Sequence, residues 1–577
     1  MHEKAEMKKS DLKAEGAKTN EVVRIFALGG LDEDGKNLTV IEIDGDIYIV
    51  ECGLKFPNDN ASLGVECIVP DFSWLKEHED RIKGILITHG HDDVMGALPY
   101  LLKEIKADVY VSPFTERVVS DLLKANKITG VRLKTVKHRD TKKIGGRQVI
   151  FFPMTHSYPQ TYGFGIRTNY GYIVYSGEFI EEYDDISRAY QGDFAFASRF
   201  KNDGVLVLLQ DSKGSENALH TSPRHKVTPY FEKVLDEHEH QRIFVEIYTQ
   251  SVYRIQEIIT CCIERKRKMC FYSKELKQLV AGLESITEAV PPELVVPTSQ
   301  IDKTDDVVVI ISGQGKALFQ LMSNIANNEV DDVEFKESDV IVVATPLVPG
   351  VEKEFKSMEN DIYKRQGTIV KIDRNVLGMH PSKEDLKMVI YTTNPKYYIP
   401  IKGEYRMLCA NAMVAEEMNI PPENIIILDN GEMATFINGE LQPGRETLEL
   451  HETLVDGNAN WDMAGVVLKD REILSTDGVM VLAIGLDFRT KKIVNGPDIQ
   501  TRGLVYVRDA EYLTREVTRI MEETISEMVE AHKYDNIECR AQIRERVARY
   551  VFKQTAKRPM ILPVILELNP KNSLSGS

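Results

Sequence analysis

The stretch ILITHGHDDVMGALPY, residues 85–100, constrains the chain more tightly than any other segment. Its apolar start predicts a buried strand, and the later apolar residues predict a helix packed on that strand. His89 and His91 come just after the strand, where side chains two positions apart in extended backbone point the same way. Both imidazoles can therefore reach one metal ion, with the carboxylate of Asp93 two positions further on. The stretch predicts a metal cluster at the end of a strand.

The length and composition of the chain indicate a large globular protein. At 577 residues it exceeds what one hydrophobic core supports, and about three or four domains are expected. No apolar run approaches the roughly twenty residues of a membrane span. Residues 1–20 read as a charged, disordered tail without the apolar core of a signal peptide. Seven cysteines without CxxC pairing indicate reduced thiols, so a cytoplasmic location is expected.

The net charge of −17 argues against indiscriminate binding of nucleic acid, which usually requires an excess of Lys and Arg. Positive charge is nevertheless clustered in places, as in residues 265–268, RKRK. A solvated helix face explains any single run of this kind. The charge balance therefore leaves open a basic channel on an acidic body.

The alternation of apolar strands with helical stretches predicts a layered α/β architecture. Residues 22–175 carry short strands separated by helices, for which two sheets with helices outside are one solution. From Val205 the pattern becomes that of a separate parallel α/β unit, with loops facing a ligand at the carboxyl ends of its strands. Residues 390–440 return to the first pattern, with a strand at Tyr397–Ile401 and a helix at Glu404–Glu417.

A last unit is expected from about residue 450 onward. Its predicted strands are Val466–Leu468, Met480–Leu486, Leu504–Val507 and Met560–Leu568, and its predicted helices are Ala510–Ala531 and Glu538–Gln554. The sequence contains neither an internal repeat nor a low-complexity segment.

A series of short motifs runs through the chain from Val22 to Leu568. They are GGLDEDGKN (29–37), ECGLKFP (51–57), THGHDD (88–93), MTHSYP (154–159), SGQG (312–315), GMHPSKEDLK (378–387), PKYYIPIKGEYRML (395–408), GPDIQTRGLVYVR (496–508) and KRPMILPVILEL (557–568). In their order and spacing they resemble the ribonuclease J family. The resemblance implies an α/β fold: a metallo-β-lactamase αββα sandwich with an inserted β-CASP α/β domain and a small α+β C-terminal domain.

The resemblance also implies domain boundaries and an activity. The metallo-β-lactamase domain would comprise residues 21–215 and 373–449, the β-CASP domain residues 216–372, and a C-terminal oligomerisation domain residues 450–577. The family cuts RNA, mainly as a 5′-to-3′ exonuclease with a preference for 5′-monophosphorylated single strands, and endonucleolytic cleavage stays open. Its members act in messenger decay and ribosomal RNA maturation, and they form dimers and tetramers.

Functional residues carry over position by position. The implied metal ligands are His89, His91, Asp93, His156 and Glu178, and the implied catalytic residues are Asp93, Glu178 and His380. The implied RNA contacts are Gln250, Ser251, Val252, Arg254, Val376, Leu377, Gly378, Met379, His380 and Ser382. Simpler interpretations stand beside these roles: leftover polar core residues for the histidines, a salt-bridged pair for Asp93 and Glu178, a helix N-cap for Ser382 and surface solvation for Arg254.

The chain departs from the family pattern at several ligand positions. Val94 and Lys402 stand where the family has histidines, and Glu51 and Glu178 stand where it has aspartates. In the β-CASP part a histidine is replaced by Tyr253. This pattern resembles the second, degenerate paralogue of the family, which associates with a more active sibling.

The altered ligands bear on how many ions the site holds. Three imidazoles and a water suffice for a catalytic zinc site, but valine cannot be a ligand and an ammonium repels a dication. We hypothesise that Lys402 sits where a second cation would be and neutralises Asp93 and Glu178. One zinc or manganese ion is favoured over two, and the absence of any ion stays open.

Two functions from different classes remain. The first, which we favour, is a ribonuclease whose activity is weakened by the loss of second-ion ligands, because two-metal hydrolysis uses both ions to stabilise attacking and leaving oxygens. The second is a largely non-catalytic RNA-binding subunit that stabilises an active ribonuclease J paralogue, so a homodimer and a hetero-oligomer are both expected assemblies. A small-molecule hydrolase is disfavoured by the β-CASP insert and the C-terminal domain.

Overall fold

The computed structural model describes residues 20–57, 65–184, 186–348, 350–372, 376, 378–456, 459–460, 466–504 and 510–568. The expected tail, residues 1–20, lies outside this part of the chain apart from Asn20. The chain divides into two compact units, one of residues 1–58 and 66–460 and one of residues 59–65 and 461–577. Within the described ranges, no helix is both long and apolar enough to cross a membrane.

The first sheet of the larger unit has nine strands and carries the histidine-rich loop. Across the sheet they are β20 (Glu440–Leu441), β19 (Glu432–Ile437), β1 (Val22–Gly29), β2 (Leu38–Ile43), β3 (Asp46–Val50), β5 (Ile82–Leu86), β6 (Val109–Val111) and β7 (Leu133–Thr135), with β21 (Glu446–Thr447) also paired to β19. β1 to β3 form an antiparallel meander, whereas β3, β5, β6 and β7 are parallel. The loop after β5 therefore lies at a carboxyl edge, where α/β proteins commonly place ligand sites.

The second sheet packs face to face on the first. Its strands are, in order, β18 (Pro395–Ile401), β12 (Val205–Asp211), β11 (Gly171–Tyr175), β10 (Tyr162–Thr168), β9 (Arg147–Pro153) and β8 (Thr141–Ile144). One hydrophobic core fills the space between the sheets, with residues such as Ile25 and Val50 from the first sheet and Phe151 and Leu209 from the second. Because β1 to β3 and β9 to β12 are buried on both faces, their residues form nearly continuous apolar runs.

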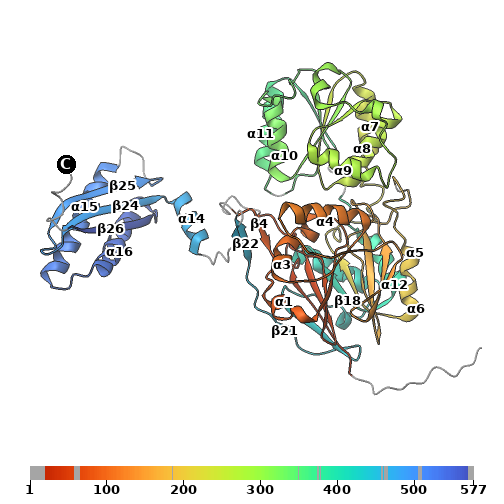
Figure 1. The fold of residues 1–577 in the computed structure, drawn as a ribbon, viewed down its shortest axis with the longest axis horizontal. Helices are drawn as coiled ribbons and strands as arrows, with labels where there is room; N and C mark the ends of the chain where they lie inside the picture. Colours follow the sequence, from red (N-terminus) through yellow and green to blue (C-terminus); the bar gives the residue numbers. More distant parts are fainter. Residues whose placement is uncertain are drawn as a thin grey trace, which may run out of the picture. The chain divides into compact units, whose positions relative to one another are not determined.

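Helices cover the outer faces of both sheets (Figure 1). α1 (Ser73–Glu77), α3 (Leu98–Glu104) and α4 (Pro113–Ala125) pack on the first sheet, and α5 (Phe194–Ala197), α6 (Arg199–Asp203), α12 (Lys383–Thr393) and α13 (Tyr405–Glu417) pack on the second. The arrangement is the expected αββα sandwich. β18, α12 and α13 complete it from a segment that follows the inserted domain in sequence.

The insert is a parallel α/β domain. Its five-stranded sheet has the order β14 (Met269–Phe271), β15 (Val308–Gly313), β13 (Ile243–Tyr248), β16 (Val340–Val343) and β17 (Thr368–Lys371). One face is covered by α7 (Thr228–Glu237), α8 (Val252–Glu264) and α9 (Lys274–Leu283), and the other by α10 (Gly315–Ala326) and α11 (Glu352–Lys364) (Figure 1). This confirms a parallel unit with buried apolar strands, but not its predicted start at Val205, because the strand that begins there, β12, belongs to the second sheet.

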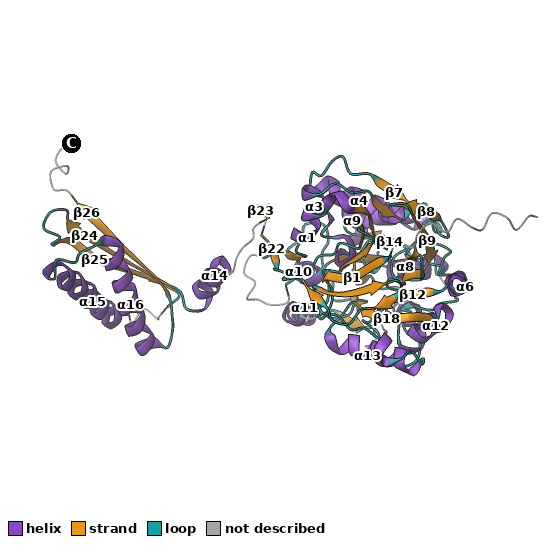
Figure 2. Cartoon of the chain, turned by 90° about the horizontal axis from the view of Figure 1, so that it is seen from below, coloured by secondary structure: helices purple, strands orange, loops and turns teal. Residues whose placement is uncertain are grey.

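The second unit is a small α+β domain. β24 (Val479–Asp487) lies between β25 (Ile493–Arg502) and β26 (Met560–Leu568), and α15 (Ala510–Glu530) and α16 (Asn536–Thr555) cover one face of this sheet (Figure 2). β26 pairs with β24 in parallel, and β25 pairs with it antiparallel. Both predicted helices and the predicted strands at β24 and β26 are present.

One strand prediction in this region is wrong, and another lies mostly outside the described residues. Val466–Leu468 begins the helix α14 (Val466–Thr476), because the good helix formers that follow extend a short apolar run whose periodicity is ambiguous. Of the strand predicted at Leu504–Val507 the structure describes only Leu504, which lies in a bend, and the rest lies outside the described residues. β25 ends before this segment, at Arg502. β25 was missed because most of its residues are polar.

The boundary between the units also differs from the expected residue 450. A small sheet joins β22 (Thr453–Asp456) to β23 (Ala459–Asn460) and to β4 (Cys67–Val69), so residues up to 460 belong to the larger unit. The described residues between 450 and 460 therefore lie in the larger unit.

Candidate active site

The histidine-rich loop follows β5 and leads into the short helix α2 (Asp92–Met95). Asp93 lies in the first turn of this helix. Gly53 packs so closely against that turn that an added Cβ would lie 1.7 Å from the carbonyl oxygen of Asp93. The side-chain amide of Asn37 donates to the carbonyl oxygen of Asp93 at 2.9 Å and to its carboxylate at 3.1 Å. Neighbouring loops of the first sheet thus fix where this carboxylate points.

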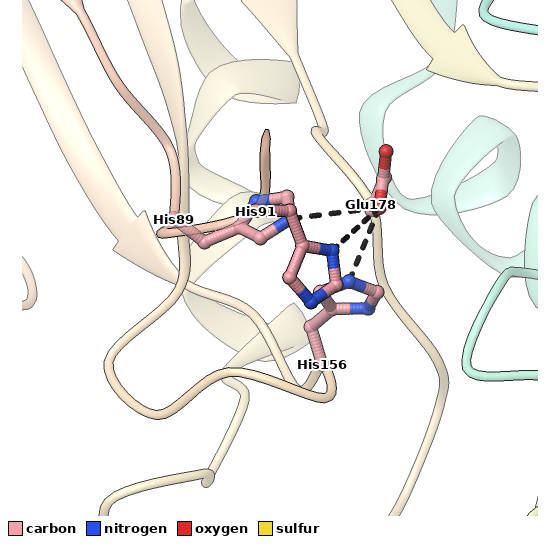
Figure 3. Close-up of side chains that lie close together, drawn as sticks. All are labelled: His89, His91, His156 and Glu178. Atoms are coloured by element: carbon pink, nitrogen blue, oxygen red, sulfur yellow. Dashed lines mark ion pairs between the residues drawn. The ribbon is translucent and has the colours of Figure 1, made fainter. Parts of the chain in front are cut away.

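Three imidazoles and one carboxylate converge between the two sheets (Figure 3). His89 Nε2, His91 Nδ1 and His156 Nε2 lie 3.5, 3.9 and 3.1 Å from Oε2 of Glu178. His156 follows β9 and Glu178 follows β11, so both sheets contribute. Donors bound to zinc at about 2.0–2.2 Å in a tetrahedron are about 3.3 Å apart. The spacing is close to that of a four-ligand metal site.

Hydrogen bonds on the far side of two rings leave a lone pair facing this cluster. His156 Nδ1 lies 2.8 Å from the carbonyl oxygen of Met379, which can only accept, so the proton is on Nδ1. His91 Nε2 lies 3.2 Å from the carbonyl oxygen of Gln250, so its proton is on Nε2. The ring atoms nearest Glu178 are then unprotonated, as metal ligands must be.

A hydroxyl group between His89 and Glu51 likewise fixes which ring nitrogen of His89 carries the proton. Thr88 donates its hydroxyl proton to Oε1 of Glu51 at 2.7 Å, so its Oγ1 accepts from His89 Nδ1 at 3.0 Å. His89 Nε2 therefore faces the cluster without a proton. All three imidazoles are held in the tautomer that could bind one ion.

Several buried atoms of the cluster have unused bonding capacity. His89 Nε2, His156 Nε2 and Glu178 Oε2 make no hydrogen bond with any described residue. The lone pairs of His156 and Glu178 face each other across 3.1 Å, an arrangement that repels unless a cation lies between them. Imidazoles with a carboxylate suit zinc or manganese. The residues present fit the expected divalent ion.

The electrostatics of the histidines also suit a ligand role. Burial, and then the neighbouring ring of His91, hold the pKa of His89 well below its usual value. Burial, and then His156, lower the pKa of His91 to about 4. Both rings are therefore neutral at neutral pH, the form in which imidazole binds metal.

Two ammonium groups lie on the other side of Glu178. Lys402 Nζ is 2.7 Å from Glu51 Oε2 and 3.0 Å from Glu178 Oε1. Lys213 Nζ is 2.9 Å from Asp93 Oδ2 and 4.0 Å from Glu178 Oε1. Lys402 thus pairs with Glu178 as hypothesised. Asp93 is in direct contact with Lys213 instead, and Lys402 acts on Asp93 only at longer range. The second partner of Lys402 is Glu51.

Sequence reasoning gave Lys213 no role. It directly follows Asp211 and Ser212 at the end of β12, which is the only signal that could have marked it. Its side chain is mostly buried, and its Nζ also lies 2.9 Å from Oδ1 of Asp34. The ammonium therefore bridges two carboxylates from different loops.

The pairing controls the charge state of the carboxylates. Burial alone would raise the pKa of Glu178, but the charges of Lys402 and Lys213 outweigh it and hold that pKa well below its usual range. Burial would likewise raise the pKa of Asp93, and Lys213 reverses the direction. For Lys402, Glu178 and Glu51 outweigh burial and raise the pKa well above the usual value. These groups stay charged at neutral pH.

Backbone strain accompanies the buried pair of Glu51 and Lys402. Both residues have positive φ, 64° and 60°, in the left-handed region that non-glycine residues rarely adopt. Both side chains are almost fully inaccessible to solvent. The pair therefore holds two unfavourable conformations in place where their strands end.

Val94 cannot contribute a ligand. Its side chain is fully buried in the core beneath the first sheet, together with Ile87 and Leu98. Its backbone carbonyl accepts from the amide of Cys52 at 2.7 Å. The position is a packing position in this chain.

His380 lies beside the cluster with its own carboxylate partner. Its Nδ1 is 2.9 Å from Asp211 Oδ2 and 3.9 Å from Glu178 Oε2. Burial would lower the pKa of His380, but the charges of Asp211 and Glu178 outweigh it and raise that pKa above the usual value. His380 is thus suited to carry a proton beside the ligand cluster.

The remaining candidate residues are divided between surface and interior. Gly378 is exposed; Gln250, Ser251 and Val376 are partly exposed; Val252, Arg254, Met379 and Ser382 are buried; and Leu377 lies outside the described residues. Ser382 caps α12 in a reciprocal capping box with Asp385. Arg254 and Val376 line a cavity of about 540 Å³, which Lys356 and Lys371 also line.

Comparisons with known proteins match three parts of the chain to domain families. Residues 31–216 match the metallo-beta-lactamase superfamily, residues 240–362 the ribonuclease J beta-CASP domain and residues 466–568 the ribonuclease J C-terminal domain. The chain is 30% identical to ribonuclease J 2 of Staphylococcus epidermidis over 562 residues, which cover 96% of this chain and 99% of that protein. It is equally similar, 30% over the same length, to ribonuclease J 2 of Staphylococcus aureus.

A solved structure resembles the larger part of the fold. A crystal structure of a protein of unknown function from Enterococcus faecalis aligns with a TM-score of 0.52 at 16% identity, covering 72% of this chain and 100% of that one. At this identity the likeness concerns the fold alone. The full-length similarity to the staphylococcal proteins and the three domain matches carry more weight, and they show that the chain belongs to the ribonuclease J family.

Proposed function

We propose that the chain is a metal-dependent ribonuclease that uses one zinc or manganese ion and degrades single-stranded RNA from a 5′-monophosphorylated end. Convergence of three correctly protonated imidazoles on Glu178 Oε2 carries the proposal. His89, His91 and His156 would hold the ion, with Glu178 at the fourth position. A bound divalent ion supplies a more acidic water and polarises a phosphoryl oxygen.

The β-CASP domain orients the proposed metal ligand His91 and also contributes expected RNA contacts. The Gln250 carbonyl oxygen orients His91, and the backbone amide of Tyr253 donates to the carbonyl oxygen of Ser157 at 2.9 Å. Among the expected RNA contacts, Gln250, Ser251, Val376, Gly378 and His380 are at least partly accessible, so we assign them, rather than the buried residues, to direct contact with RNA.

The activity should be weak because only half of a two-ion site remains. Val94 is a packing residue, and the carboxylate of Asp93 is already paired with Lys213. A single ion stabilises the attacking and leaving oxygens less than two ions do. We therefore propose slow turnover of RNA, in the messenger decay and ribosomal RNA maturation that the family resemblance implies.

An exonuclease assay tests the proposal. Highly purified protein should release nucleotides from 5′-monophosphorylated RNA with added manganese or zinc, more slowly from 5′-hydroxyl RNA, and not at all after chelation. Readdition of the ion should restore the rate. An unchanged rate in the presence of chelator would refute metal dependence, and an absence of cleavage with either ion would favour the non-catalytic subunit.

His380 is proposed as the proton donor to the leaving 3′ oxygen. Its Nδ1–H donates to Asp211, so Nε2 is the atom that can transfer a proton. The raised pKa keeps the ring protonated above the ordinary histidine value of about 6.5, and the rate should fall as pH rises through that raised pKa.

Substituting His380 by glutamine should lower the rate by about 10²–10⁴-fold and remove this alkaline decline, because glutamine carries no transferable proton. Rate against pH at saturating metal checks the prediction, with thermal melting as the folding control. A glutamine variant that keeps the alkaline decline would show that another group donates the proton.

A specific observation favours the subunit role as a second function. The open face of the C-terminal sheet displays Leu562, Val564, Leu566 and Leu568, alternate residues of β26 that all point away from the helices. Exposed apolar rows of this kind commonly mark protein interfaces. We propose that this face binds a second copy of the chain or a ribonuclease J paralogue.

Placing a charge in this row should weaken assembly. Leu566, with 54% of its surface exposed, can be changed to aspartate without disturbing the core on the opposite face. Light scattering across a concentration series should show a lower mass for Leu566→Asp, alone and mixed with an active paralogue. Tyr363→Asp, an exposed aromatic on α11, is the matched control that should assemble normally.

A further inference from the structure

The two oxygens of Glu178 serve opposite sides of the site. Oε2 is the atom nearest the histidines, and Oε1 is the atom nearest the lysines, 3.0 Å from Lys402 Nζ and 4.0 Å from Lys213 Nζ. One carboxylate thus separates a cluster of neutral donors from a cluster of ammonium groups. In a two-ion centre, such a carboxylate would have a cation on each side.

The lysine side carries as much positive charge as a second divalent ion would supply. The carboxylates Glu51, Asp93 and Glu178 each contact one of the two ammonium groups, which together carry a charge of +2. Asp93 also accepts from Asn37, so its Oδ2 has both a charged and a neutral donor. Adding an ion beside Asp93 would require Lys213 to leave.

We propose that Lys213 and Lys402 together act as a resident dication that takes the place of a second metal ion, and that Lys213 is the group that keeps Asp93 from binding one. The inference rests on the proposed one-ion function. It makes Lys213 a positioning residue, which acts by holding Asp93 and Asp34 rather than by touching the scissile bond.

A resident dication predicts a different metal content from the simple loss of imidazole ligands. If only imidazoles were missing, restoring them with Val94→His and Lys402→His would create a second ion site. With Lys213 still paired to Asp93, the restored imidazoles lack their carboxylate partner. We therefore expect a second ion only when Lys213→Met is added to the two histidine substitutions.

Metal content per chain, measured by native mass spectrometry after zinc loading and gel filtration, tests this. We expect one zinc ion in the wild-type chain and in Val94→His/Lys402→His, and two in the triple variant with Lys213→Met. Lys396→Met, which removes an exposed ammonium group, replaces Lys213→Met in the control triple variant and should leave one ion. Two ions in Val94→His/Lys402→His, or one in the triple variant, would overturn the proposal.

The outcomes separate this inference from the proposed function. A wild-type chain without zinc would refute the one-ion centre itself, and a wild-type chain with two ions would refute the resident dication.

Because Val94 is a core position, its substitution could misfold the chain. A second test therefore uses two substitutions that leave Val94 unchanged. Lys213→Met/Lys402→Gln should gain a weak manganese site in titrations by electron paramagnetic resonance, and Lys402→Gln alone should not. The absence of that gain in the folded double variant would contradict exclusion by the lysines.

Discussion

Replacing Lys402 with methionine is expected to lower the free energy of unfolding by about 3–5 kcal/mol, the usual cost of breaking a buried ion pair from one side. The change leaves Glu51 and Glu178 without their nearest cation in a site that excludes water. Urea denaturation of the metal-free protein at neutral pH measures the effect. The substitution should be partly rescued by Glu51→Gln in the same chain, because that change removes one of the two stranded charges.

Lys396→Met is the matched control, because it breaks an exposed pair with Glu440 and should change stability little. Acidification gives a second check on Lys402→Met. The lowered pKa of Glu178 means that its contribution to stability is present above the ordinary glutamate pKa and is lost as pH falls. The difference between wild type and variant should therefore shrink as pH falls below the ordinary glutamate pKa of about 4.3. A difference that grows with acidification would show that Glu178 is not held ionised by Lys402.

The proximity of two proposed metal ligands, His89 and His91, was predictable from sequence because their geometry is local. His89 and His91 follow a strand at a spacing of two, and that spacing alone places both rings on one side. His156 and Glu178 needed the family resemblance, since only the packing of the second sheet on the first brings them near the loop. The tautomer of His156 depends on the carbonyl oxygen of Met379, and that of His91 on the carbonyl oxygen of Gln250; both partners are distant in sequence and could not be predicted.

The lysine side could be predicted only in part. The position of Lys402 in a family motif indicated that a cation replaces a ligand, but not that Glu51 would be its nearest partner. Lys213 comes from the end of β12 and meets Asp93 only through the tertiary fold. Neither periodicity nor motif spacing encodes such a contact, because salt-bridge partners are chosen by three-dimensional proximity.

Strand and helix prediction failed where local patterns were weak. The apolar run at Val466–Leu468 is too short for its period to be distinguished, and β25 has a mostly polar sequence. The buried, parallel strands of the β-CASP sheet were recovered because both faces are covered, which makes their sequences continuously apolar.

The joint substitution His89→Ala and His91→Ala is expected to remove the bound ion and to lower RNA cleavage by at least about 100-fold, because metal-activated water is the proposed nucleophile. Two of the three imidazoles that face Glu178 are lost, and the remaining donors cannot complete a four-ligand site. Metal content and exonuclease rate should be measured on the same preparation. His240→Ala with His451→Ala, two exposed histidines outside the cluster, should change neither quantity. Equal cleavage by the wild-type chain and the cluster variant would mean that the activity belongs to a contaminating nuclease, leaving the chain as an RNA-binding subunit.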